Sequence, residues 1–232
     1  MVRRLTVEWP DARPFAGRDG RPIRWLAVSD DPDPTLDHAV NRAGLGTLDA
    51  IVGAGDLEPD YLGFLADAFA VPLAFVRGNH DQGGHWREAA HSLAPTPLRT
   101  GRLHTVTGLP LVALEWPGLR HGGRLRADRS AWTDTMAVVA RRVVAPSRSR
   151  AGPVVVLSHA PPRGLGDRAA DPYHVGYAGY RWLLDRWRPP LWLHGHVPPA
   201  SVDGWQVGHE GTAVVNVTGA VLIEIGPPPA TT

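Results

Sequence analysis

The chain has 232 residues and no cysteine, which excludes a disulfide-stabilised fold, thiolate zinc clusters and cysteine nucleophiles. All 24 basic residues are arginine, so Schiff-base chemistry on lysine is excluded as well. The formal net charge is only +1, which argues against a strongly charged nucleic-acid or membrane surface. With 23 acidic residues and 11 histidines, any catalytic chemistry has to use oxygen and imidazole groups.

The chain is expected to be one soluble domain. Its N-terminus has two arginines but lacks the apolar run of ~7–15 residues that a signal peptide needs, and no stretch approaches the ~18 apolar residues of a membrane span. These observations predict a cytoplasmic protein with no membrane partner. We interpret residues 1–232 as a single domain in which 226–232 form a flexible, proline-rich tail.

Short apolar runs that end abruptly in small or polar residues alternate with helix-like stretches. The runs predict buried strands at 23–30, 48–56, 71–81, 152–162 and 189–196. The stretches between them predict helices at 35–43, 58–70, 133–144 and 177–188. Strands that alternate with helices indicate a largely parallel sheet with helices packed on it.

A second group of strand candidates has no helices between its members. It comprises residues 101–108, 109–118, 205–219 and 220–226, which are expected to pair antiparallel. The predicted fold class is therefore α/β, a four-layer αββα sandwich of two mixed sheets flanked by helices. Within this group, Asn216-Val217-Thr218 matches a glycosylation sequon, which we interpret as a chance match inside a strand.

Polar residues gather where the predicted parallel strands end. Because parallel strands deliver their last residues to one edge of a sheet, these side chains are expected to converge there. They are Asp30, Asp56, Asn79, His80, Asp81, His159 and His196. Carboxylate, amide and imidazole ligands together suit Mn, Fe, Zn or Mg ions, and a shared carboxylate can hold two metals ~3.5–4 Å apart.

The same residues carry a resemblance to a known family. The order Asp30, Gly55-Asp56, Gly78-Asn79-His80-Asp81, His159 and Gly195-His196 resembles the D-x-H, GD, GNH[DE], H and GHxH pattern of the calcineurin-like metallophosphoesterases. The resemblance implies that Asp56 bridges two metals and that Asn79, His159 and His196 complete one metal site, while Asp30 serves the other. It also implies that His80 faces the scissile phosphate and that Asp81 orients its ring.

Two positions depart from that pattern, and both belong to the same implied metal site. Pro32 stands where D-x-H has histidine, and Pro198 stands where GHxH has its last histidine. Asp33 is the nearest candidate replacement ligand, with Asp31 behind it, although aspartate beside proline also forms turns. His194 is a third candidate, for which packing or a hydrogen bond is the competing interpretation.

Three further residues are candidate substrate contacts. Arg120 lies in a loop-like segment at 115–123 that could overhang the metal centre, with a solvated loop as the alternative. Arg163 follows His159 closely, and His174 lies on the next loop. The nine tryptophans are mostly expected in the core, and no basic groove accompanies them that would indicate nucleic-acid binding.

The sequence thus predicts a metal-dependent phosphoesterase that hydrolyses a small phosphoester by attack of a metal-activated water. The resemblance favours a phosphodiester over a monoester. One or two divalent ions per chain are expected, Mn first, with Fe, Zn or Mg as alternatives. A degenerate phosphoesterase fold that binds a ligand or partner without turnover is the rival hypothesis, and a working one-metal enzyme is a third.

Overall fold

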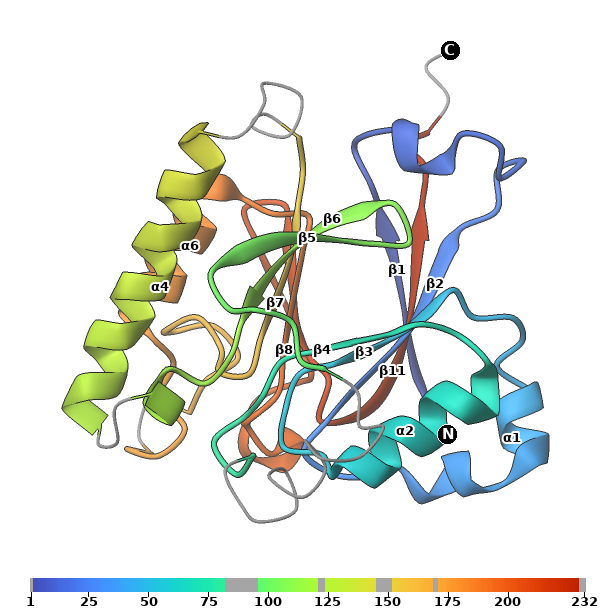
Figure 1. Ribbon diagram of the computed structural model, residues 1–232, viewed down its shortest axis with the longest axis horizontal. Helices are drawn as coiled ribbons and strands as arrows, with labels where there is room; N and C mark the ends of the chain where they lie inside the picture. The colour runs from blue at the N-terminus through green and yellow to red at the C-terminus, as the bar shows by residue number, and fades with distance from the viewer. Residues whose placement is uncertain (1, 82–95, 121–123, 145–151, 169–170, 230–232) are drawn as a thin grey trace.

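The computed structural model describes residues 2–81, 96–120, 124–144, 152–168 and 171–229. Two β-sheets pack face to face, with helices on the outer face of each (Figure 1). The first sheet holds, in spatial order, β1 (Arg3–Glu8), β11 (Gly219–Gly226), β2 (Ile23–Ser29), β3 (Ala50–Gly53) and β4 (Leu73–Phe75). The second holds β5 (Arg102–Val106), β6 (Leu109–Leu114), β7 (Val155–Ser158), β8 (Leu191–His194), β10 (Thr212–Asn216) and β9 (Gln206–His209).

Helices form the outer layers of the sandwich. The α-helices are α1 (Ala39–Ala43), α2 (Pro59–Phe69), α4 (Arg124–Val144) and α6 (Ala178–Trp187). Short 3-10 turns are η1 (Arg13–Phe15), η2 (Pro34–Asp37), η3 (Pro117–Arg120) and η4 (Pro199–Ser201). In Figure 1, α4 and α6 cover the second sheet at the left, and α1 and α2 cover the first at the right. The predicted αββα architecture is confirmed.

Both sheets are mixed. Parallel pairing joins β2, β3 and β4 in the first sheet, and β6, β7, β8 and β10 in the second. Within the second predicted group, β5 pairs antiparallel with β6 and β9 with β10, whereas β11 pairs antiparallel with β2 and parallel with β1. The parallel strands therefore end at a common edge, which positions the polar residues that follow them.

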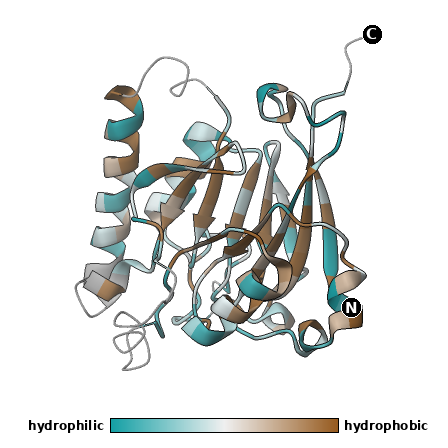
Figure 2. Cartoon of the chain, turned by 45° about the vertical axis from the view of Figure 1, so that its right-hand side comes forward, coloured by the Kyte–Doolittle hydropathy of each residue, from teal (hydrophilic) through white to brown (hydrophobic). Residues whose placement is uncertain are grey.

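The core is built by residues that alternate between the two faces of each strand. Along β7, Val155 and Leu157 pack between the sheets, whereas Val156 packs under the helices. Trp25 of β2 is likewise fully buried between the sheets, where its indole N–H donates to Thr107 Oγ1 at 2.8 Å. Figure 2 shows the resulting apolar strands inside more polar helices. Burial of each such side chain contributes about 1.5–3 kcal/mol.

Four elements differ from the sequence prediction, one of them the strand candidate at 205–219, which forms two antiparallel strands, β9 and β10. β1 is absent from the prediction because it is short of apolar residues. Only Leu5 and Val7 face the core from this strand, which lies at the edge of its sheet, and its other residues are polar or charged. The helix predicted at 35–43 divides into η2 and α1, because His38 between them is extended. α4 begins at Arg124, well before the predicted residue 133. In the part of the chain that the structure describes, no helix is long and apolar enough to cross a membrane.

Candidate metal centre

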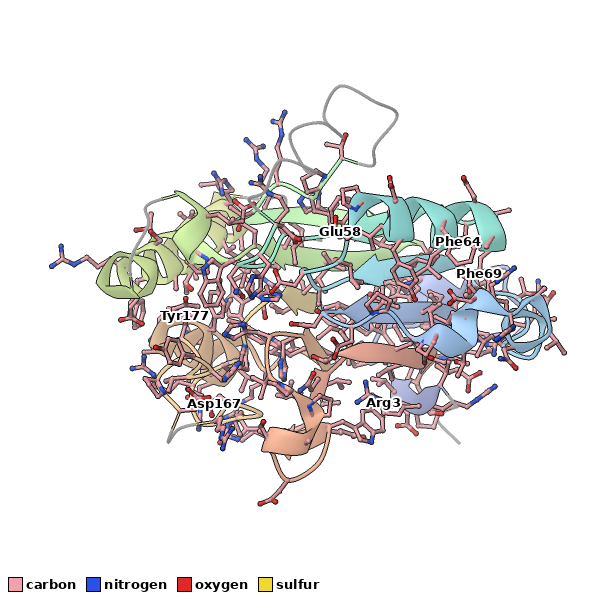
Figure 3. All side chains as sticks on the ribbon, turned by 90° about the horizontal axis from the view of Figure 1, so that it is seen from below. Arg3, Glu58, Phe64, Phe69, Asp167 and Tyr177 are labelled. Atoms are coloured by element: carbon pink, nitrogen blue, oxygen red, sulfur yellow. The ribbon has the colours of Figure 1, made fainter. Side chains whose placement is uncertain are left out.

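Five loops bring polar side chains to the edge where the parallel strands end. They follow β2, β3 and β4 of the first sheet and β7 and β8 of the second. Figure 3 shows the layers from below, with Phe64 and Phe69 marking α2 and Tyr177 marking the start of α6. A cavity of about 620 Å³ opens there, lined by Asp30, Asp31, Asp56, Asn79, His80, Trp116, Tyr173, His174, His196, Pro198 and Thr218.

Asp56 lies in the loop after β3, in a left-handed backbone conformation with φ of 56°. Its Oδ1 accepts a hydrogen bond from the backbone N–H of His80 at 2.7 Å, and its Oδ2 lies 3.2 Å from Nε2 of His159. Burial would raise the pKa of this carboxyl, but the bonds from His159 and His80 lower it below its ordinary value. Gly78 is required here, since a Cβ at that position would overlap the Asp56 carboxylate.

His159 is fully buried, and both of its ring nitrogens are engaged. Nδ1 lies 2.7 Å from the carbonyl oxygen of Ala54, to which it donates. This contact turns Nε2 toward Asn79 Oδ1 at 2.9 Å and Asp56 Oδ2 at 3.2 Å. Burial alone would lower the pKa of His159, but the hydrogen bond and charge of Asp56 raise it to about 9. A proton on Nε2 therefore takes the place that a cation would occupy.

His196 is the third side chain that faces this point. It lies in the loop after β8 with φ of 68°, and its Nε2 is 2.9 Å from the carbonyl oxygen of Tyr173. Donation from Nε2 leaves Nδ1 as the lone-pair nitrogen of the neutral ring. Burial lowers the pKa of His196 to about 3, so the ring stays neutral and needs no deprotonation before it binds a cation.

The donor set fits a divalent cation. One ligand atom from each of Asp56, His159 and His196 lies within 4.8 Å of the others, and Asn79 Oδ1 adjoins the same His159 nitrogen. Lone pairs that face one another repel unless a proton or cation lies between them. Two imidazoles and two oxygens form the mixed set that Mn, Fe and Zn accept. The structure thus brings together four of the five predicted metal ligands around one point.

The fifth predicted ligand, Asp30, lies against the cavity but is bound by hydrogen-bond donors. Its Oδ2 accepts from Ser29 Oγ at 2.5 Å and from Thr218 Oγ1 at 3.1 Å. The backbone N–H of His196 lies 3.1 Å from Oδ1 and 2.9 Å from Oδ2. Gly195 permits this approach, since a Cβ there would overlap Ser29 and Asp30. Asp30 therefore ties the His196 loop to the end of β2.

Of the three candidate replacement ligands, Asp31 is exposed and lines the cavity, whereas Asp33 and His194 have other tasks. Asp33 caps η2, where its Oδ1 accepts from the backbone N–H of Thr35 at 2.9 Å and from the Thr35 hydroxyl at 2.7 Å. His194 shares the helix-facing side of β8 with Trp192, and its Nε2 borders Gly166. Neither residue lines the cavity. The turn interpretation of Asp33 and the packing interpretation of His194 describe these placements.

His80 and Asp81, the predicted catalytic residues, differ in exposure. His80 is exposed and lines the cavity, which is compatible with contact to a substrate. Asp81 is buried, and its Oδ2 accepts from the backbone N–H groups of Gly78 at 2.7 Å and Asp56 at 2.9 Å. These two bonds brace the loops that carry Asp56 and Asn79. Orientation of the His80 ring by Asp81 stays a prediction.

The predicted substrate contacts differ in where their side chains lie. His174 lines the cavity, and its Nδ1 lies 2.7 Å from Asp171 Oδ2, which fixes the ring. Arg163 turns away from the cavity, because its guanidinium donates to the Gly176 carbonyl at 3.0 Å and lies 3.6 Å from Asp128. The side chain of Arg120 lies outside the described residues.

Trp116 lies in the segment 115–123, a candidate to overhang the metal centre, and it lines the cavity and packs against His196 with ring centroids 4.7 Å apart. The structure also brings residues to the cavity that the sequence did not indicate. Tyr173 lines it and supplies the carbonyl that orients His196, and Thr218 lines it as well. Thr218 and Asn216 are nearly fully buried, and Thr218 N–H donates to Asn216 Oδ1 at 3.0 Å. The sequon-like tripeptide is therefore a structural support of the centre, and its polar residues beside a strand end were the available signal.

Comparison with known proteins gives a family and a similar fold. The family model for calcineurin-like phosphoesterases matches residues 35–200. Among solved structures, TT1561 of Thermus thermophilus is similar, with a TM-score of 0.54 and 18% identity over 85% of this chain and 90% of that chain. Wild-type Vps29 complexed with Zn²⁺ from Entamoeba histolytica aligns over 85% of this chain and 74% of that one, with 9% identity and a TM-score of 0.34, too low to support an argument. No curated protein matches the chain.

Proposed function

Because this chain belongs to the calcineurin-like phosphoesterase family, we propose that it hydrolyses a phosphoester with the help of a divalent cation. Asp56, Asn79, His159 and His196 would hold the cation, Mn²⁺ first among the candidates. The convergence of ligand atoms from Asp56, His159 and His196 within 4.8 Å is the observation that carries the proposal. A bound divalent cation supplies Lewis-acid charge to a phosphoryl oxygen and lowers the pKa of an attacking water.

The chain's own residues have separable tasks in this reaction. The Ala54 carbonyl and the Tyr173 carbonyl orient the two imidazoles, so the ligand atoms are positioned before a substrate arrives. His80 is held at its backbone by Asp56 and lines the cavity, which supports a role for its exposed ring in giving a proton to the departing oxygen.

The cavity supports a small substrate. Its volume of about 620 Å³ lies within the ~300–1,000 Å³ range of small-molecule sites, and its wall includes Trp116 and Tyr173. His174, fixed by Asp171, lies on the same wall and is proposed to contact the substrate. The resemblance to small members of the family favours a phosphodiester over a monoester.

Paired aspartate variants test the proposal. The substrates are bis(p-nitrophenyl) phosphate and p-nitrophenyl phosphate, with Mn²⁺-loaded protein. Asp56→Asn is expected to abolish hydrolysis, because it replaces a ligand oxygen at the point of convergence. Asp33→Asn makes the same chemical change in a residue that caps η2 outside the cavity, and it is expected to keep wild-type activity. Retained activity in a folded Asp56→Asn protein would contradict the assignment.

The rival function, binding without turnover, rests on Pro32 and Pro198. Proline has no side-chain donor, so a site that needs two cations for hydrolysis would be inactive here. This rival predicts that wild-type protein binds Mn²⁺ with micromolar or better affinity and still hydrolyses neither substrate. Measurable Asp56-dependent turnover would contradict it.

A further inference from the structure

The family pattern makes Asp30 a ligand of the metal site that also lacks its two histidines, at Pro32 and Pro198, which we call the altered half of the pattern. In the structure, the Asp30 carboxylate is instead surrounded by hydrogen-bond donors. Three donors approach its Oδ2, namely Ser29 Oγ, Thr218 Oγ1 and the backbone N–H of His196. An ionised carboxylate offers about four lone-pair sites on its two oxygens. Oδ2 therefore has more donors than its two lone pairs accept, whereas Oδ1 accepts only the shared His196 N–H.

The same bonds hold the backbone of His196, which belongs to the other metal site of the pattern, the one whose residues are all present. His196 adopts a left-handed conformation, which is unfavourable for a residue with a Cβ and needs local support. The bonds from its N–H to Asp30 provide that support directly. Asp30 is itself left-handed with φ of 58°, and its N–H donates to the Gly55 carbonyl at 3.1 Å. Asp30 thus connects the Asp56 loop to the His196 loop through hydrogen bonds alone.

No second cluster of ligands accompanies Asp30. Across the described ranges, only Asp56, His159 and His196 form a group of three His, Asp or Glu side chains whose ligand atoms all lie within 4.8 Å of one another. Pro32 and Pro198 offer no donor, Asp33 and His194 lie outside the cavity, and Asp31, which does line it, is exposed. Among the described residues, a second cation near Asp30 would therefore find carboxylates but no histidine of a three-residue cluster.

We propose that this site holds one divalent cation per chain and that Asp30 is a hydrogen-bonded clamp for the His196 loop, not a cation ligand. The proposal rests on the cation site of the proposed function and defines its stoichiometry. Asp30 is a positioning residue, because it acts through the His196 backbone.

Mn²⁺ titration of the full-length, cation-free protein tests the stoichiometry without any substrate. Isothermal titration calorimetry and native mass spectrometry count the ions, and electron paramagnetic resonance reports their surroundings. We expect one Mn²⁺ per chain and the six-line spectrum of an isolated ion. Two ions that share Asp56 at ~3.5–4 Å would give a spin-coupled spectrum, and that result would overturn the proposal while leaving the proposed function intact. Absence of any bound Mn²⁺ would overturn the proposed function itself.

Asp30→Asn separates a clamp from a ligand. If Asp30 is a clamp, the variant still binds one Mn²⁺, with affinity reduced by no more than about tenfold, the low end of the range for groups that position a ligand. Loss of Mn²⁺ binding by a folded Asp30→Asn protein would overturn the clamp assignment.

Ser29→Ala keeps the test decisive if Asp30→Asn does not fold. It removes one donor to Asp30 and leaves the carboxylate in place. A clamp predicts a lower melting temperature with one isolated Mn²⁺ still bound. If Asp30 is a ligand, Ser29→Ala instead frees a lone pair and raises the Mn²⁺ count or affinity, which would contradict the proposal.

Discussion

The cavity has two sides that can be compared. The Asp56 side consists of Asp56, Asn79, His159 and His196, and the Asp30 side consists of Asp30, Pro32 and Pro198. Each side contains an aspartate that follows a parallel strand and has a left-handed backbone conformation. On the Asp56 side, oxygen and nitrogen ligand atoms converge on one point. On the Asp30 side, hydroxyl and amide hydrogens face the carboxylate. The surrounding donors, more than the aspartate itself, decide whether such a residue can bind a cation.

The largest effect is expected from His159→Ala. Loss of the buried nitrogen between Asp56 and Asn79 should weaken Mn²⁺ binding by more than the ~100-fold typical of residues that only support a ligand, and should abolish hydrolysis. His194→Ala is the matched control, because His194 is equally buried but lies on the helix-facing side of β8. Calorimetric titration of both variants makes the comparison. Equal Mn²⁺ affinity in the two variants would contradict the assignment of His159, and not His194, as a ligand.

The next effect is the pH dependence of the cation-free protein. The pKa of His159 is raised to about 9, so its proton stabilises the fold fully below about pH 6.5 and progressively less as the pH rises through about 9. The contribution is up to about 3 kcal/mol. Urea unfolding between pH 6 and 10, with His159→Gln as the variant that lacks this proton, measures it. An identical pH profile for the two proteins would show that the Asp56 contact does not hold the proton.

Restoring both missing histidines asks whether the Asp30 side can still bind a cation. In the double variant Pro32→His, Pro198→His, a second Mn²⁺ is expected to bind at least about tenfold more weakly than the first, because Asp30 must give up hydrogen bonds worth about 1 kcal/mol each. Competition titration with native mass spectrometry resolves the two steps. Two equally tight ions in the double variant would mean that the hydrogen bonds of Asp30 do not oppose ligation.

A smaller effect is expected from Thr218→Val. It removes the hydroxyl that donates to Asp30 and should lower the free energy of unfolding by about 1 kcal/mol. Thr35→Val removes a comparable hydroxyl bond to Asp33, away from the cavity. Both variants should lose similar stability, but only Thr218→Val should lower the Mn²⁺ affinity, by a few-fold. Chemical denaturation and calorimetry separate the two quantities.

The smallest effect is expected from Tyr173→Ala. The side chain is 78% exposed, and the group that orients His196 is the backbone carbonyl, which the variant keeps. The free energy of unfolding should change by no more than about 0.5 kcal/mol, and Mn²⁺ binding should stay unchanged. A large loss of Mn²⁺ affinity would show that the ring, and not the carbonyl, positions His196.

The sequence was sufficient where the signal is local. Apolar runs indicate buried strands, and the residues directly after them are where a parallel sheet must place its functional groups. The convergence of Asp56, Asn79, His159 and His196 could therefore be predicted without coordinates. The loop-bracing bonds of Asp81 and the outward turn of Arg163 were not, because each depends on which backbone groups of neighbouring loops come within reach.

The role of Asp30 shows the limit more sharply. One of its donors is the adjacent Ser29, but Thr218 is 188 residues away in sequence and the His196 N–H is 166 residues away. A motif identifies an aspartate after a strand, but it contains no information on donors from so distant a segment. β1 is likewise hard to predict from its own residues, because its apolar alternation is weak and its pairing with β11, more than 200 residues later, makes it a strand.

The position of β11 between β1 and β2 also has a consequence for biosynthesis. Arg3 donates to the Thr218 carbonyl across a separation of 215 residues, and β2 pairs with the same late segment. While the ribosome is still translating, β2 presents an unpaired edge that β11 alone completes, so the first sheet closes only after nearly the whole chain has emerged. Thr218 arrives with β11, so the nascent chain acquires the Asp30 contacts at the end of synthesis. Until then, the backbone N–H and C=O groups on the β11-facing edge of β2 lack their final partners and can pair with another chain.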